Sequence, residues 1–163
     1  GGRGKGGVPV LIPPGVLGAR SPVRLSRQHG VLIRSPRAEL LFGSAEVLVP
    51  AGALTVIPGV RETPAGRVRW VHLMTARHDI LSANGLLCEG FRPGPWGQSQ
   101  LPASMRAEVS RVSRGADTRA ARPILRLREA RLLLAEGRPP AATARLARPP
   151  QVGAPHPFGA SLP

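Results

Sequence analysis

The stretch that decides the fold covers residues 26–91, SRQHGVLIRSPRAELLFGSAEVLVPAGALTVIPGVRETPAGRVRWVHLMTARHDILSANGLLCEGF. Short apolar runs alternate in it with tight-turn dipeptides, and it holds three of the four histidines of the chain. Runs of this length bounded by Gly and Pro indicate short β-strands joined by turns. The 163 residues also include 19 prolines and 20 glycines, which disfavours a bundle of long helices. We therefore expect the folded part to be all-β.

A meander is predicted near the start of this stretch. The apolar runs at residues 30–34 and 38–42 flank Ser35-Pro36-Arg37, which is typical of a three-residue hairpin connection. A third run at residues 46–49 follows a Gly-Ser turn and ends before Pro50. Three successive strands joined by such turns form a meander.

A second hairpin is predicted around Asn84-Gly85. The flanking runs are residues 78–83 and 86–91. Both central residues of a two-residue hairpin turn need positive φ, which Asn and Gly tolerate best. Further strands are expected over residues 8–12 at a sheet edge, over 23–25, and over 67–74 around Trp70.

The composition changes after residue 94. Residues 103–112 predict a short helix, and residues 123–136 predict another, with Pro123 in its first turn and Gly137 just past its end. The broad apolar face of this second helix predicts packing on the sheet. We expect a flexible N-terminus over 1–7, a partial domain over 8–94, a linker and helical appendage over 95–137, and a disordered tail over 138–163.

The high net positive charge suggests the hypothesis that the chain binds nucleic acid. The formal net charge is +14, yet Lys5 is the single lysine among 23 basic residues. Such an arginine bias, with abundant Ala, Gly and Pro, is what GC-rich coding produces. Aromatic residues make up 3% of the chain, so stacking platforms for single strands are scarce. We interpret the arginines as a solvated surface and expect no nucleic-acid partner.

The single cysteine, Cys88, excludes an intrachain disulfide. Because it follows two leucines inside an expected strand, we interpret it as a buried thiol rather than a nucleophile. No cluster of Cys, His or carboxylates has ligand spacing, so we expect no metal and no cofactor. No apolar run approaches the roughly 20 residues of a spanning helix, which excludes membrane insertion. The sequence does not encode a compartment, although a secreted or cell-surface parent is compatible with it.

Ser26 and His29 are the first candidates for chemistry. They lie three residues apart at the entry to a strand, where a hydroxyl and an imidazole can face one peptide carbonyl. The same spacing is also common in purely structural pairs. His72, beside Trp70, is interpreted as a packed or hydrogen-bonded histidine rather than a ligand, and His156 falls in the Pro-rich tail.

The segments SRQHGVLIRSPRAELLFGSAEVLVPAGAL (26–54) and RWVHLMTARHDILSANGLLCEGFRPG (69–94) resemble the later two-thirds of a bacterial Hint domain, the hedgehog/intein fold. The resemblance covers about residues 8–94, and ARPILRLREARLLLA (121–135) is similar to the segment that follows such domains. It implies a horseshoe-like all-β fold that cleaves its own backbone. A Cys, Ser or Thr at the first position of the domain attacks the preceding carbonyl and forms a thioester or ester.

The resemblance also implies roles for three residues. Ser26 and His29 match the Thr-x-x-His motif, which polarises the scissile amide and protonates its departing nitrogen. His78 matches a later histidine of the family, with one extra residue before Asn84-Gly85. His72 stands where inteins carry an aspartate, so that role is not transferred.

Three departures from the family pattern shape the expected activity. Residues 1–7 carry no Cys, Ser or Thr, and the chain starts with Gly1 rather than Met, so we expect a fragment whose nucleophile lies upstream. Glu89 and Gly90 stand where inteins end in His-Asn, so we do not expect this chain to splice. Ser26 replaces Thr but keeps the hydroxyl.

Three functional hypotheses result. The first is a truncated self-processing Hint domain that performs an N-to-S or N-to-O acyl shift and peptide cleavage in the complete parent, with its own upstream polypeptide as substrate. This monomeric chain alone would be inactive. The second is a non-catalytic Hint-fold interaction or structural module. The third is a basic nucleic-acid-binding module, whose affinity would fall steeply with salt.

Overall fold

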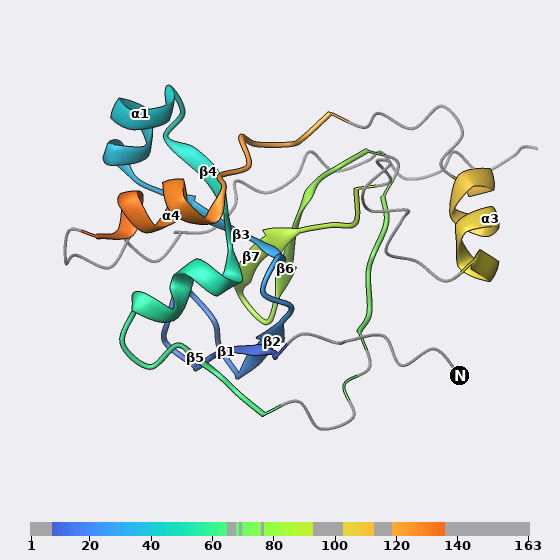
Figure 1. The fold of residues 1–163 in the computed structure, drawn as a ribbon, viewed down its shortest axis with the longest axis horizontal. Coiled ribbons are helices and arrows are strands. Elements are labelled where there is room, and N and C mark those ends of the chain that lie inside the picture. Colours follow the sequence, from blue (N-terminus) through green and yellow to red (C-terminus); the bar gives the residue numbers. More distant parts are fainter. Residues whose placement is uncertain are drawn as a thin grey trace, which may run out of the picture.

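The computed structural model describes residues 8–64, 68, 70–75, 77–92, 103–112 and 119–135. Within them, two antiparallel sheets form the body of the molecule (Figure 1). The first sheet has the order β2-β1-β5 and the second β4-β3-β7-β6. This architecture confirms the predicted all-β fold. The strands are β1 Val10–Ile12, β2 Val23–Leu25, β3 Gly30–Arg34, β4 Glu46–Pro50, β5 Arg61–Glu62, β6 Ile80–Ala83 and β7 Leu86–Glu89, and the helices are α1 Pro36–Phe42, the 3₁₀ helix η1 Ala51–Val56, α3 Ala103–Val112 and α4 Leu127–Leu134.

Strand β1 occupies the centre of the first sheet, with Val10 opposite both Leu25 and Glu62. The prediction of an edge strand over residues 8–12 is therefore wrong. Pro9 and Pro13 lie outside the paired residues, so no proline interrupts the ladder on either side of β1.

Strands β3 and β4 are buried on both faces of the second sheet. Val31 and Ile33 of β3 belong to the main core, whereas Leu32 packs with Leu48 and Leu87 in a smaller cluster on the other face. Alternate side chains of a strand point to opposite faces, so both sets must be apolar when both faces are covered. This explains why the two strands are continuous apolar runs in the sequence.

The strand predicted over residues 38–42 is wrong, because these residues belong to helix α1. Ser35 is extended and its hydroxyl accepts a hydrogen bond from the Arg37 N–H, and Pro36 stands in the first turn. Gly43 ends the helix with φ of 69°, in the left-handed conformation that suits glycine. Strands β3 and β4 still pair along their whole length, but a capped helix joins them instead of a tight turn.

The hairpin predicted at Asn84-Gly85 is confirmed as β6 and β7. Asn84 has φ of 52° and Gly85 has φ of 92°. The turn lies against the loop after β1: the Arg20 N–H donates to the Asn84 carbonyl at 2.7 Å. A Cβ on Gly85 would lie 2.4 Å from the Gly18 carbonyl oxygen, so this approach requires glycine.

The strand predicted over residues 67–74 does not form among the described residues of that range. Val68, Val71 and Leu73 are exposed there rather than paired in a sheet. The segment is held at the end of β7 instead, where the Phe91 N–H donates to the Leu73 carbonyl at 2.7 Å. It forms one wall of the cleft described below.

Residues 119–135 pack back onto the second sheet. The Leu48 N–H donates to the Pro123 carbonyl at 2.8 Å, and the Leu125 N–H donates to the Leu48 carbonyl at 2.9 Å. This short parallel pairing lies along the outer side of β4. An ion pair between Arg122 Nε and Glu46 Oε2, 2.6 Å apart, reinforces it.

Helix α4 begins four residues after the predicted start at Pro123, because the intervening residues pair with β4. The predicted packing on the body is found: α4 contacts η1, β4 and α1, and Ala130 and Leu133 are buried in the main core together with Leu125. Its apolar face is narrower than predicted, since Leu132 is 52% exposed. Helix α3, predicted over the same residues, lies apart from both sheets in Figure 1.

Three sequence predictions concern residues that the structure does not describe: the flexible N-terminus over 1–7, the linker over 95–102 and the disordered tail over 138–163, which holds His156. Among the residues that are described, no helix is long and apolar enough to span a membrane.

Candidate functional site

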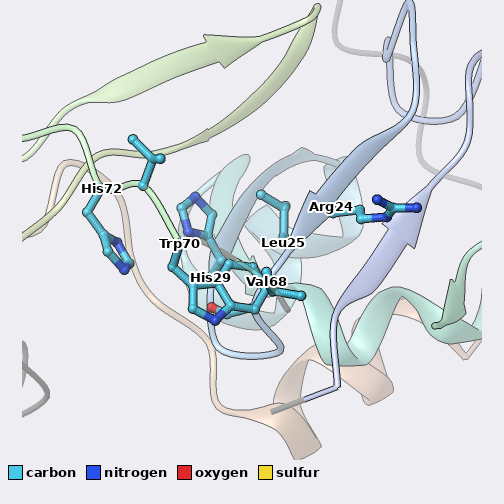
Figure 2. A pocket seen from close by; sticks show the side chains of 8 residues that line it. Arg24, Leu25, His29, Val68, Trp70 and His72 are labelled. Carbon is cyan, nitrogen blue, oxygen red and sulfur yellow. The ribbon is translucent and has the colours of Figure 1, made fainter. Parts of the chain in front are cut away.

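A cleft of about 370 Å³ lies between the end of β2 and the segment that follows β5 (Figure 2). Ser26 and His29, two of the three predicted site residues, line it on one side. Trp70 and His72 line it from the other segment. Arg24 also lines the cleft, but in Figure 2 its guanidinium extends away from the two imidazoles. The structure therefore brings Ser26 and His29 to a common cavity.

Backbone hydrogen bonds hold the turn that carries these two residues. The His29 N–H donates to the Ser26 carbonyl at 3.0 Å, which closes a four-residue turn. At the start of η1, the Gly52 N–H donates to the Arg27 carbonyl and the Ala51 N–H to the His29 carbonyl, each at 2.9 Å. The first N–H groups of a helix have no partner inside it, so they are free to anchor this turn. The position of His29 is thus fixed through its main chain.

The ring of His29 is hydrogen-bonded on one side only. It bonds to the backbone of Glu89, while its Nε2 atom is buried and has no hydrogen-bond partner among the described residues. Burial lowers the pKa of His29 below 6.5; the Glu89 carboxylate acts in the opposite direction, and His72 lowers the pKa further. With the Glu89 bond on the Nδ1 side, a neutral ring carries its lone pair on Nε2, ready to accept a proton.

His78, the third predicted site residue, is 3% exposed and does not line the cleft. Its Nδ1 accepts a hydrogen bond from the Ala121 N–H at 2.9 Å, so Nδ1 carries no proton and Nε2 does. Nε2 lies 3.3 Å from Glu89 Oε2. This contact is electrostatic, because the N–H direction does not align well enough for a hydrogen bond.

Glu89 connects the two histidines, although it was not predicted as a site residue. Its side chain is 19% exposed, and Oε1 accepts a hydrogen bond from the Gly30 N–H at 2.6 Å. A Cβ at Gly30 would lie 2.8 Å from Glu89 Cδ, so the Glu89 carboxylate can occupy its position beside residue 30 because that residue is glycine. Two features of the sequence could have pointed to Glu89: it is a carboxylate at the end of an apolar run, and a glycine directly follows His29. Only the pairing of β3 with β7 shows that the two meet.

Two further residues were singled out by the sequence. Cys88 is 4% exposed, and burial, with a smaller effect of Glu89, raises its pKa to about 11, so the thiol is protonated at neutral pH. This supports its interpretation as a buried thiol. His72 is exposed rather than packed on a strand, and its ring lies edge-on to Phe91 with centroids 5.7 Å apart. Within the described ranges, no three His, Cys, Asp or Glu side chains are grouped to hold a metal ion.

Comparison with protein families identifies one match, to the Hint domain, over residues 3–95. Comparisons with curated proteins and with solved structures give no significant match. The matched residues include the cleft, His29, His78 and Glu89, and they end before α3 and α4. Hint domains are self-processing domains, and the match spans more than half of the chain. With two antiparallel sheets and the Ser26-x-x-His29 turn at its cleft, this chain belongs to the Hint family.

Proposed function

We propose that this domain promotes cleavage of a peptide bond in its own polypeptide by an N-to-S or N-to-O acyl shift. The observation that carries the proposal is the Nε2 atom of His29, which is buried, has no partner among the described residues and belongs to a residue lining the cleft. An imidazole held neutral by burial, with one ring nitrogen free, is suited to take a proton and return it.

In the proposed step, the proton that leaves the attacking group is returned to the departing nitrogen within the site. A thiol or hydroxyl attacks the carbonyl carbon that precedes it, and His29 Nε2 takes the proton of that group. The new C–S or C–O bond forms as the C–N bond breaks, and His29 returns the proton to the departing nitrogen. The amide is thereby replaced by a thioester or ester and a free amine within one connected chain. Water then hydrolyses that thioester or ester, which releases a carboxylic acid on one piece and restores the thiol or hydroxyl on the other. Ser26, at the same cleft, offers a hydroxyl that can donate to the oxygen of the scissile carbonyl.

In this proposal the attacking thiol or hydroxyl is supplied by the polypeptide joined to the N-terminal side of the domain; residues 1–7 contain neither group. Cys88 does not serve, since its thiol is buried and its pKa is raised to about 11. His78 does not line the cleft; in this proposal it acts indirectly, through its contact with the Glu89 carboxylate.

The test is cleavage of the parent polypeptide, followed by intact mass. We expect the unchanged parent to cleave itself and His29→Ala to be slower by about 10²–10⁴-fold, the usual contribution of a general acid–base. His156→Gln is the control, because it removes an imidazole at a position outside the residues matched by the family. We expect it to cleave nearly as fast as the parent.

Two results would contradict the proposal. Equal rates for His29→Ala and the parent would remove His29 from the reaction. A folded parent that stays intact, even with an added thiol to trap a thioester, would leave this chain as a non-catalytic module with the Hint fold.

A further inference from the structure

We propose that Glu89 is a positioning residue: its carboxylate holds His29 in place through Gly30 and stabilises the charged ring that His29 becomes when it takes a proton. The reaction served is the one proposed above, so the inference rests on that function for its purpose. The arrangement itself can be tested without any cleavage.

The first support is where the carboxylate binds. Gly30 directly follows His29 and begins β3, and its N–H donates to Glu89 Oε1 at 2.6 Å. Strands β3 and β7 pair with Val31 opposite Cys88, which places Gly30 and Glu89 beside one another. A hydrogen bond to an ionised acceptor is stronger than a neutral one. The carboxylate therefore fastens the main chain next to the imidazole to the neighbouring strand.

The second support is how the carboxylate is held in turn. Its other oxygen, Oε2, faces His78 Nε2 at 3.3 Å. Because the Ala121 N–H occupies Nδ1, His78 directs its proton-bearing nitrogen toward Glu89. The carboxylate thus lies between a backbone N–H and an imidazole N–H. Each carboxylate oxygen therefore has one contact, and 19% of the side chain is exposed.

The third support is the charge that faces His29. Burial and His72 both disfavour its protonated form, and the Glu89 carboxylate favours that form. Arg24, which lines the same cleft, extends away from the ring in Figure 2. A base that is itself oriented by a third group recurs in nucleophilic catalysis. Here Glu89 orients the base through the adjacent backbone and compensates part of the cost of charging it.

The test is an NMR titration of the His29 ring in the whole chain, with Glu89→Gln beside Glu46→Gln. Glu46 is a matched control, because its side chain is also 19% exposed and it pairs with Arg34 and Arg122 instead of histidines. We expect the titration midpoint of His29 to fall in Glu89→Gln, since a neutral amide no longer favours the charged ring. We expect no change in Glu46→Gln. The Gly30 amide resonance should also move in Glu89→Gln alone.

Unchanged His29 and Gly30 signals in Glu89→Gln would overturn the inference. If Glu89→Gln does not fold, Glu89→Asp replaces it: the charge is kept but the shorter side chain withdraws from Gly30, so an unmoved Gly30 amide resonance overturns the inference.

Cleavage of the parent separates the two proposals. A lowered His29 midpoint in a parent that never cleaves would keep the role of Glu89 and refute the proposed function. Normal cleavage with unmoved His29 and Gly30 signals would refute the role of Glu89 alone.

Discussion

Replacement of Leu133 by Ala tests whether α4, which lies beyond the family match, belongs to the folded core. Leu133 is 6% exposed and packs in the main core, which contains residues of both sheets. Replacement of a buried Leu by Ala costs about 2–5 kcal/mol, from lost burial and the cavity left behind. Because α4 covers the outside of that core, we expect the lower part of this range, about 2–3 kcal/mol of unfolding free energy.

The measurement is urea unfolding of the whole chain, with Leu132→Ala as the control. Leu132 is the preceding residue of the same helix and is 52% exposed, so the same chemical change there should cost no more than about 0.5 kcal/mol. In a domain of about 100 residues, each 1 kcal/mol lowers Tm by about 4–8 °C. The two variants should therefore differ by at least about 1.5 kcal/mol, and Leu133→Ala should melt at least about 6 °C below Leu132→Ala. Equal stability of the two variants would show that α4 only touches the body, and the reasoning would fail.

The remaining predictions concern Cys88 and His29. Cys88 should resist alkylation in the native chain at about pH 8, because its pKa is raised to about 11 and it is buried; intact mass should show the adduct only after denaturation, and rapid native labelling would contradict this. The folded-state pKa of His29 lies below the ordinary 6.5, so the unfolded chain takes up the proton first and His29 destabilises the fold increasingly as pH falls from 6.5 toward that lower value. His29→Gln should lose this part of the acid sensitivity in urea titrations, and identical pH dependence in both chains would count against the buried, neutral ring.

The strands that the sequence predicted correctly are those whose signals are local. β3 and β4 are continuous apolar runs because each is buried on both faces, and Asn84-Gly85 supplies the positive φ that its turn needs. Ser26 and His29 were expected at the entry to a strand, and β3 begins directly after His29. These features depend on a few neighbouring residues, which a sequence displays directly.

The errors come from competing local signals and from tertiary partners. In residues 38–42 the apolar run favoured a strand, yet Ser35, Pro36 and Gly43 supply a complete pair of helix caps, and these prevailed. Residues 67–74 have a strand-like pattern but find no partner strand among the described residues. Glu89 was missed because its role depends on a tertiary contact. It bonds to Gly30 on a neighbouring strand, 59 residues away in the sequence.

The pairing of residues 123–125 with Leu48 also bears on self-association. β4 is the outermost strand on its side of the second sheet, and it is strongly apolar. An uncovered strand of this kind offers its N–H and C=O groups to other molecules and promotes aggregation. The N–H and C=O of Leu48 are instead taken by Pro123 and Leu125. A version of this protein shortened to the family match would expose that edge, so insoluble or intermolecularly paired material is the outcome to expect from trimming it there.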